Sequence, residues 1–234
     1  MAKIVSAIIP AHNEAGRIGR AIALLRQVHM IGEIIVVDDG STDDTAQEAR
    51  ACAHLVLMLP EKRGKCYAMH VGVAHAKHDI ILFCDADMYG FTPRDIEQLL
   101  SPVVDSSFDM SVGLRTKPYY FSRFVPIAAQ FSGLRAILRT RWGSMPFLFV
   151  TGFQIELALY LFARGEQWKT SYMHIPGLRH TIKEDKYGVW NGLRARINMI
   201  TEIIGLLIAV YLSQKQRTVQ RRVAPRFKKA NRLL

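Results

Sequence analysis

Short apolar runs alternate with helical stretches through the first hundred residues, and this alternation constrains the fold more than any other feature. The predicted strands lie at 4–9, 34–37, 55–59 and 80–84, and the predicted helices lie at about 15–29, 44–52 and 64–76. Strands that are apolar throughout are typical of a parallel sheet that is covered on both faces. The pattern therefore predicts an α/β fold, a three-layer α/β/α sandwich with a mostly parallel sheet.

An acidic pair, Asp85 and Asp87, follows the apolar run Ile80-Ile81-Leu82-Phe83-Cys84 directly. Open α/β sheets bind their ligands at the carboxyl ends of the strands. A pair of carboxylates at such a position suits a hard divalent cation, because Mg²⁺ takes one or two protein carboxylates and completes its shell with substrate phosphates. Taken alone, the pair could also be an acidic turn exposed to solvent.

Two common nucleotide-binding loops are excluded. A Walker A loop would need Gly at position 59 and Ser or Thr at 66, where the chain has Leu59 and Cys66, and no G-x-G-x-x-G sequence follows the first strand. The three cysteines (Cys52, Cys66 and Cys84) show no C-x-x-C spacing and are odd in number, which favours reduced thiols over a disulfide framework or a zinc site.

Four motifs follow one another along the first half of the chain: Pro10-Ala11-His12-Asn13-Glu14, Val37-Asp38-Asp39-Gly40-Ser41-Thr42-Asp43-Asp44-Thr45, Arg63-Gly64-Lys65 and Asp85-Ala86-Asp87. Their order and spacing resemble those of family 2 glycosyltransferases with the GT-A fold, in particular polyprenyl- and dolichyl-phosphate sugar transferases. The resemblance is strong over about residues 4–115 and looser over 151–186. The resemblance implies a GT-A fold and a nucleotide-sugar donor, a UDP- or GDP-hexose.

The resemblance also implies roles for residues of the first half. Asp38 and Asp39 would accept hydrogen bonds from the base or ribose, since a carboxylate can accept from a ring N–H but not from a phosphate. Lys65 would face the diphosphate. The alternatives without a binding role are helix capping for the two aspartates and a solvated surface position for the lysine. The remaining donor residues implied are Pro10, Ala11, Asn13 and Glu14 at the base and ribose, with Asp85, Ala86 and Asp87 holding Mg²⁺ or Mn²⁺ against the diphosphate.

In the second half the same resemblance implies the acceptor side of the site. Glu156 would face the sugar and the acceptor from a helix that begins near Thr151 and Gly152, and His180 would be a third metal ligand. A hydroxyl acceptor needs a carboxylate base, for which Asp185 or Glu184 is the candidate. A phosphate acceptor needs none, and Arg179 and Lys183 would then steady it. Inversion and retention at the anomeric carbon both stay open.

Charge divides the chain. Residues 1–110 carry 10 Lys/Arg and 15 Asp/Glu, net −5, whereas residues 111–234 carry 21 and 5, net +16. The basic half predicts an anionic partner.

Two stretches have amphipathic helical spacing: 125–142, with Leu134 and Leu138 on its apolar face, and the segment from Trp190 to Tyr211. Eight Lys/Arg and no acidic residue follow in 214–234.

An amphipathic helix with a basic tail predicts binding in the headgroup plane of an anionic membrane. The uncharged end of that helix, 203–214, is too short to cross a bilayer. The alternatives are packing against the core or against a second copy in a homo-oligomer for the helices, and a disordered solubilising end for the tail. Because the chain enters a strand almost at its first residue, we expect no signal peptide, and a cytoplasmic protein that is peripheral on the inner face of the membrane.

These features predict a GT-A domain over 1–186, with a nucleotide-sugar half (1–115) and an acceptor half (116–186), followed by C-terminal amphipathic helices and a basic tail over 187–234. The predicted function is metal-dependent transfer of a hexose to a lipid-linked acceptor such as polyprenyl phosphate. A soluble enzyme acting on a small anionic acceptor, such as a phosphoglycerate, is the alternative. Nucleic-acid binding is disfavoured because Phe227 is the only aromatic residue in the basic tail, and a nucleotidyltransferase would need a glycine-rich first turn.

Overall fold

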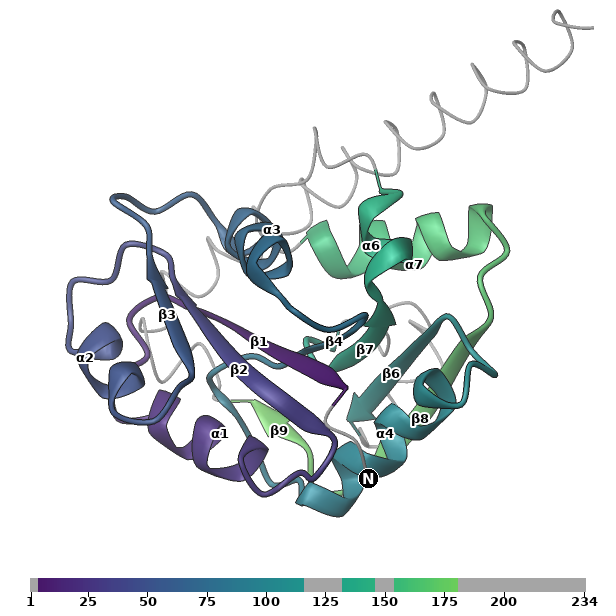
Figure 1. Ribbon diagram of the computed structural model, residues 1–234, viewed down its shortest axis with the longest axis horizontal. Helices are drawn as coiled ribbons and strands as arrows, with labels where there is room; N and C mark the ends of the chain where they lie inside the picture. The colour runs from purple at the N-terminus through teal and green to yellow at the C-terminus, as the bar shows by residue number, and fades with distance from the viewer. Residues whose placement is uncertain (1–3, 116–131, 146–153, 181–234) are drawn as a thin grey trace, which may run out of the picture. The chain divides into compact units, whose positions relative to one another are not determined.

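The structure is a computed structural model that describes residues 4–115, 132–145 and 154–180 (Figure 1). The chain divides into two units, Met1–Lys186 and Tyr187–Leu234, and every described residue belongs to the first. The predicted amphipathic helix and basic tail over 187–234 lie outside the described residues. Among the helices that the structure describes, none combines the length and apolar character needed to cross a membrane.

Seven strands form one sheet in the order β3-β2-β1-β4-β7-β6-β8. The strands β3, β2, β1 and β4 run parallel, as do β6 and β8, while β7 is antiparallel to both of its neighbours. The mostly parallel α/β sheet expected from the sequence is therefore confirmed. The strand bounds are β1 Val5–Ala11, β2 Ile31–Asp38, β3 Leu55–Met58, β4 Ile80–Phe83, β6 Met110–Arg115, β7 Arg135–Leu138 and β8 Thr170–Ile175.

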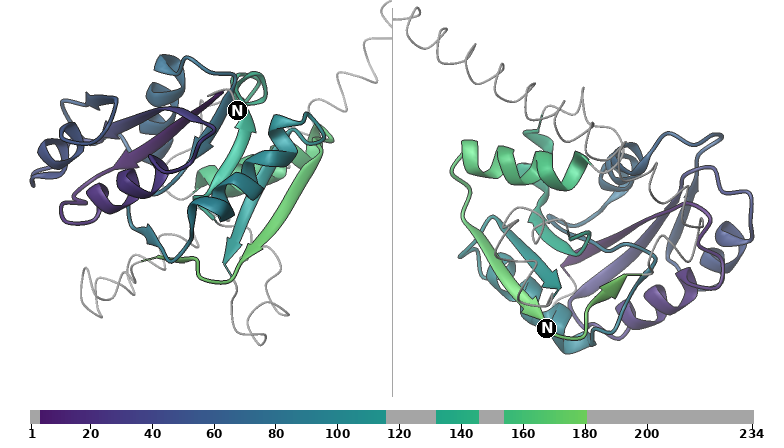
Figure 2. Two further views of the ribbon diagram at one scale, coloured as in Figure 1. Left: turned by 60° about the horizontal axis from the view of Figure 1, so that its bottom comes forward. Right: turned by 180° about the vertical axis from the view of Figure 1, so that it is seen from behind.

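Helices cover both faces of the sheet, with α1, α2 and α4 on one side and α3, α6 and α7 on the other (Figures 1 and 2). The helices α1, α2 and α3 are each shorter than the sequence pattern predicted. The difference is largest for α1, which spans 18–25 rather than 15–29. The bounds are α1 Ile18–Leu25, α2 Thr45–Arg50, α3 Lys65–His75, α4 Pro93–Val104, α6 Arg139–Gly143 and α7 Gln154–Gly165.

Alternating side chains of the central strands supply both layers of the core. Ala7 and Ile9 of β1 belong to the cluster that includes the apolar side of α1 and α4. Ile8, between them in the sequence, points to the other face, where a Cβ on Gly72 of α3 would lie 2.5 Å from its Cγ2. Since Ile8 is 0% exposed, the strand is buried on both sides, as its uninterrupted apolar sequence indicated.

The structure of the described part of 125–142 differs from the prediction made from the sequence. We expected an amphipathic membrane-surface helix there, but Arg135–Leu138 is the strand β7, hydrogen-bonded between β4 and β6. Leu134 is 0% exposed and Trp142 of α6 is 1% exposed, with its ring centroid 4.7 Å from that of Phe83. The apolar residues of this segment thus fill the core, and their spacing matched a helix by coincidence. Residues 125–131 lie outside the described residues.

A second, two-stranded sheet pairs β5 (Met88–Tyr89) with β9 (Arg179–His180) in antiparallel fashion. The sequence analysis predicted no strand at Arg179–His180. Gly90 and Gly177 flank this ribbon, and a Cβ on Gly177 would lie 1.9 Å from the carbonyl oxygen of Gly90. Such a close backbone approach requires glycine, so the ribbon ties the segment after the acidic pair to residues about ninety positions later.

Candidate active site

Three of the sequence motifs follow parallel strands and therefore meet at one edge of the sheet. The strands β1, β2 and β4 end at Ala11, Asp38 and Phe83, and β1 lies between the other two. The backbone N–H of Asp39 donates to the carbonyl of Ala11 over 2.8 Å, which holds the first two loops side by side. The first strand is thus flanked at its carboxyl end by the loops that open α/β sheets use for ligands.

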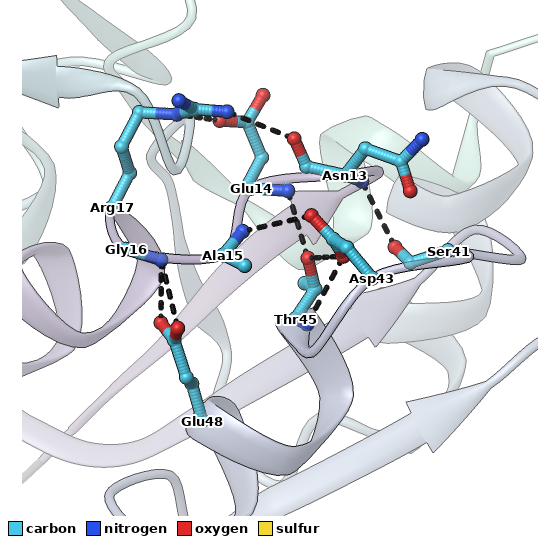
Figure 3. Close-up of polar contacts among 9 residues, drawn as sticks. All are labelled: Asn13, Glu14, Ala15, Gly16, Arg17, Ser41, Asp43, Thr45 and Glu48. Atoms are coloured by element: carbon cyan, nitrogen blue, oxygen red, sulfur yellow. Dashed lines mark hydrogen bonds and ion pairs between the residues drawn. The ribbon is translucent and has the colours of Figure 1, made fainter.

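The loop after β1 is bound to the loop after β2 by a series of hydrogen bonds (Figure 3). The N–H of Asn13 donates to Oγ of Ser41 over 3.0 Å, and the N–H of Glu14 donates to Oγ1 of Thr45 over 2.7 Å. Asn13 has a φ of 56°, a left-handed conformation that asparagine tolerates better than most residues. The two loops therefore form one unit in which the backbone shape is set by side chains of the second motif.

Asp38 and Asp39 are both buried, at 2% and 4% exposure. Asp38 Oδ1 accepts from the backbone N–H of Ser41 over 3.1 Å and from its hydroxyl. The two oxygens of Asp39 accept from the backbone N–H groups of Arg63 and Gly64, over 2.6 and 2.8 Å. The second aspartate therefore holds the loop before α3 in place. Each oxygen of Asp39 has a further lone pair, so this role leaves room for a bond to a ligand.

Lys65 joins two carboxylates from distant parts of the chain. Its ammonium lies 2.7 Å from Oδ1 and 2.9 Å from Oδ2 of Asp85, and 2.6 Å from Oε1 of Glu156. Lys65 begins α3, Asp85 follows β4 and Glu156 lies in the first turn of α7, so one ion cluster links three elements. The side chains are mostly shielded, with 22%, 20% and 7% exposure respectively. The lysine is thus part of this ion cluster and is not a solvated surface residue.

The ion cluster shifts the pKa of its members. Burial alone would lower the pKa of Lys65, but the charges of Asp85 and Glu156 and the hydrogen bonds to them outweigh it and raise the pKa well above its ordinary value. Burial would raise the pKa of Glu156, but Lys65 and Arg135 together bring it below its ordinary value. Both groups are therefore held in their charged forms at neutral pH.

Arg135 of β7 is a second buried cation beside this cluster, at 2% exposure. Its Nη2 and Nε donate to the carbonyl oxygen of Ser132 over 2.7 and 3.2 Å. Burial lowers its pKa, against the opposing charges of Glu156 and Asp85. The sequence analysis missed this residue, because it interpreted 125–142 as an amphipathic surface helix. An arginine among the apolar residues 134–138 was the available signal, since such a residue is buried only when it has partners.

Gly133 completes the surroundings of Asp85. A Cβ at Gly133 would lie 2.0 Å from Oδ2 and 2.3 Å from Cγ of Asp85, so the backbone of the segment before β7 rests directly against the carboxylate. No sequence motif had pointed to Gly133, because its role depends on a contact between residues 48 positions apart. Together with Lys65, the glycine fixes where the carboxylate of Asp85 can lie.

Asp87 lies one residue before β5, in a turn closed by the hydrogen bond from the N–H of Met88 to the carbonyl of Asp85 over 3.2 Å. Met88 pairs with His180, and Tyr89 pairs with Arg179, so the main chain of the predicted third metal ligand lies beside the acidic motif. Arg179 is exposed. The side chain of His180 and the predicted residues Thr151, Gly152, Lys183, Glu184 and Asp185 lie outside the described residues.

The residues present fit a divalent cation that is completed by a substrate. Asp85 and Asp87 offer hard oxygen ligands, and the ammonium of Lys65 already occupies a position between carboxylates where positive charge is attracted. Within the described ranges no group of three or more His, Cys, Asp or Glu residues is placed to hold a metal. A pair of carboxylates plus substrate phosphates is a donor set typical of Mg²⁺ or Mn²⁺.

Comparison with known proteins agrees with this geometry. The model of the family described as glycosyl transferase family 2 matches residues 6–158, which is more than half of the chain. The 4,4'-diaponeurosporenoate glycosyltransferase of Staphylococcus aureus (strain USA300) is 36% identical over 104 residues, which cover 42% of this chain. The chain spans only 28% of that relative's length. The matched region of the family model includes all four sequence motifs and Glu156.

Among solved structures, glucosyl-3-phosphoglycerate synthase of Mycobacterium tuberculosis has a similar fold. Its complex with Mn²⁺, UDP and glucosyl-3-phosphoglycerate superposes with a TM-score of 0.73 at 21% identity, covering 89% of this chain and 80% of that one. Its complex with Mg²⁺ and UDP gives a TM-score of 0.71 at 21% identity, covering 89% and 79%. The predicted GT-A fold is thereby confirmed.

Proposed function

Because the chain belongs to glycosyl transferase family 2 and is a glycosyltransferase, we propose that it transfers a hexose from a UDP- or GDP-sugar to a lipid-linked acceptor at a membrane surface. The observation that carries the proposal is the acidic pair Asp85 and Asp87 at the carboxyl end of β4, next to the loops after β1 and β2. This edge is where a parallel sheet of this kind receives a nucleotide.

The donor is proposed to bind across the loops of the first half. Pro10 to Glu14 line the base and ribose, and Asp38 and Asp39 offer their remaining lone pairs to the base. The bonds from Asn13 to Ser41 and from Glu14 to Thr45 support this arrangement, because they order both loops before a ligand arrives. Preordered loops reduce the entropy lost on binding.

Asp85 and Asp87, with His180, are the residues that would hold Mg²⁺ or Mn²⁺ against the diphosphate. When bound, such an ion neutralises the negative charge that develops on the departing nucleoside diphosphate. The similar structures that contain UDP with Mn²⁺ or Mg²⁺ support the proposed cofactor. Lys65 supplies a fixed positive charge at the same edge and orients the carboxylate of Asp85.

The described carboxylates differ in how well they suit proton transfer. Glu156 has a lowered pKa, an ion pair with Lys65 and little contact with solvent, so it is a weak base and is better suited to positioning. If the acceptor is a hydroxyl, we propose that Asp185 or Glu184 is the base that removes its proton. A phosphate acceptor is already anionic and needs no base, and Arg179 and Lys183 would contact it.

The lipid-linked acceptor rests on the sequence of the second half. The amphipathic spacing over 190–211 and the eight basic residues of 214–234 suit an anionic membrane surface. The relative named as a diaponeurosporenoate glycosyltransferase is consistent with an acceptor of this type. Polyprenyl phosphate is the acceptor we would test first, because it combines an apolar chain with an anionic nucleophile.

A small anionic acceptor is the second candidate. The net charge of +16 over residues 111–234 would also attract a free phosphorylated acid, and the similar solved structures are of a glucosyl-3-phosphoglycerate synthase. In this case residues 187–234 would not be needed for turnover. The two candidates share the donor site and differ in what the basic half contacts.

The donor site is tested by thermal unfolding with UDP, GDP, UDP-glucose and GDP-mannose, each with and without Mn²⁺. A ligand that binds the native state raises the unfolding temperature. We expect a shift that depends on Mn²⁺ and on one of the two bases. If none of the four ligands shifts the unfolding temperature with Mn²⁺ present, the proposed donor site is wrong.

The acceptor is tested by transfer of radiolabelled hexose to polyprenyl phosphate in vesicles and, separately, to 3-phosphoglycerate in solution. The full chain and a chain ending at residue 186 are compared, with the metal-dependent donor shift as the control for folding. Transfer to the lipid that needs 187–234 supports the lipid-linked acceptor. Transfer to 3-phosphoglycerate by both chains supports the second candidate and contradicts the first.

A further inference from the structure

The ammonium of Lys65 occupies the position of a cation in the site. It lies within 2.9 Å of both oxygens of Asp85 and 2.6 Å from Oε1 of Glu156. A divalent ion held by Asp85 would need the same oxygens. The ammonium and the metal ion repel one another. Each lone pair of the carboxylate that faces them can bind only one of the two cations.

We propose that Lys65 is an internal counter-ion that competes with the divalent cation for Asp85, and that the diphosphate of the donor draws the lysine away. This inference rests on the proposed function, in which a metal and a diphosphate share this edge of the sheet. Lys65 thereby couples the two binding events: the metal binds weakly alone and tightly together with the nucleotide.

The surroundings of the lysine allow such a change of partner. Lys65 begins α3 directly after Gly64, whose φ of 92° places the lysine at a turn, and no atom lies within 4 Å of a Cβ built on that glycine. A lysine has a flexible four-carbon stem and a compact charge, so it can exchange one anionic partner for another without a change of the backbone.

Arg135 explains why the lysine is the cation that moves. Its guanidinium donates two hydrogen bonds to the carbonyl of Ser132, three residues away in the same segment, and at 2% exposure the side chain is enclosed by the core. Its charge acts on Glu156 and Asp85 alike. When Lys65 turns to the diphosphate, Arg135 remains as the positive neighbour of Glu156, so that buried carboxylate is not left without a counter-charge.

A purely structural ion bridge makes the opposite prediction from a competing one. If Lys65 only held Asp85 in place, its removal would disorder the carboxylate and weaken metal binding. If Lys65 competes, its removal frees both oxygens of Asp85 and strengthens the binding of metal in the absence of nucleotide. The sign of the change therefore distinguishes the two roles.

The test measures Mn²⁺ binding to the full chain by electron paramagnetic resonance, with and without the nucleotide that stabilises the wild type. Lys65→Met is compared with the wild type and with Lys62→Met, which removes an exposed lysine from the same loop. We expect Lys65→Met to bind Mn²⁺ alone at least fivefold more tightly and to show a smaller enhancement by nucleotide than the wild type, because only the part that comes from direct contact between metal and phosphate remains. Because the coupling between two ligands is reciprocal, the enhancement of nucleotide binding by Mn²⁺ should fall by the same factor in Lys65→Met. Lys62→Met should match the wild type in both measurements.

If Lys65→Met binds Mn²⁺ as tightly as the wild type or more weakly, the competing role of Lys65 is wrong. The proposed function still stands in that case, provided that the wild type shows the Mn²⁺-dependent nucleotide shift. If the wild type itself binds neither Mn²⁺ nor nucleotide, both are wrong. Should Lys65→Met fail to fold, the double variant Lys65→Met/Glu156→Gln also removes the charge of the buried carboxylate that loses its lysine partner, and it carries the same expectation. Circular dichroism checks folding in each case.

Discussion

The carboxylate of Asp85 rests against the backbone of Gly133, with 2.0 Å between its Oδ2 and the position that a Cβ would take. No side chain larger than hydrogen fits there unless the carboxylate moves. The contact is made between the end of β4 and the segment that leads into β7, which is paired to β4 in the sheet. The position of a candidate metal ligand is thus set by a glycine far away in the sequence.

Gly133→Ala is therefore expected to displace Asp85 and to weaken Mn²⁺-dependent nucleotide binding at least tenfold. Overpacking of this kind costs about 1–3 kcal/mol of stability, so the protein should still fold. Gly143→Ala is the matched control, because a Cβ at Gly143 meets no atom within 4 Å. Binding is measured by titration calorimetry with the nucleotide and Mn²⁺. Unchanged affinity in Gly133→Ala would show that the carboxylate of Asp85 is not needed where the structure places it.

Asp87→Ala is expected to abolish the Mn²⁺-dependent part of the thermal shift by nucleotide and to abolish turnover, because one of two proposed carboxylate ligands is lost. The unfolding temperature without ligand should change little, since Asp87 lies in a partly exposed turn. Asp79→Ala serves as the control, as the side chain of Asp79 is 84% exposed at the opposite end of β4. Activity like that of the wild type in Asp87→Ala would refute its assignment as a ligand.

The pair of Lys65 and Glu156 is expected to stabilise the fold as a unit. Breaking a buried pair costs about 3 kcal/mol, so Lys65→Met and Glu156→Gln should each destabilise the protein by about that amount, and the double variant by clearly less than the sum. Urea unfolding of the four proteins at pH 7 measures the coupling. Additive effects would mean that the two groups do not interact in solution.

The same pair predicts how stability depends on pH. Glu156 has a folded pKa below its ordinary value of 4.5, so its contribution is fully present above pH 4.5 and is lost as the pH falls through the lower folded value. The difference in unfolding free energy between the wild type and Glu156→Gln should be constant from about pH 5 to 8 and shrink below that range. Urea unfolding at several pH values tests this, and a difference that grows on acidification would contradict it.

Of the three thiols, Cys52 is expected to react alone in the native state. Burial, helped by the charge of Glu156, raises the pKa of Cys66 to about 11, and burial beside Asp85 and Asp87 raises that of Cys84 further. At pH 8 about one part in a thousand of Cys66 is thiolate, the reactive form. Labelling with 5,5'-dithiobis(2-nitrobenzoate) should give one thiol in the native protein and three in urea. Rapid native labelling of Cys52→Ser would contradict the burial of the other two.

The local part of the fold followed from the sequence. The apolar runs of β1, β2 and β4 were predicted within a few residues, because burial on both faces leaves a continuous apolar signature. The edge strand β3 was also predicted from its apolar run, although Leu55 and Met58 are exposed. The order and spacing of four motifs indicated the family, and the family model covers all of them. Such features depend on neighbours in the chain and can be recognised without a partner.

Tertiary structure decided which distant residues meet. The helical spacing over 125–142 was misleading because periodicity does not reveal that a segment will be inserted as an antiparallel strand, which needs free edges on β4 and β6. Asp39 binds the loop at 63–64, and His180 pairs with Met88, through contacts that close only when the sheet has formed. Lys65 meets Glu156 across 91 residues of chain. The sequence determined which groups carry charge and which strands end in carboxylates, whereas the pairing of those charges depended on packing between elements, which is a non-local property.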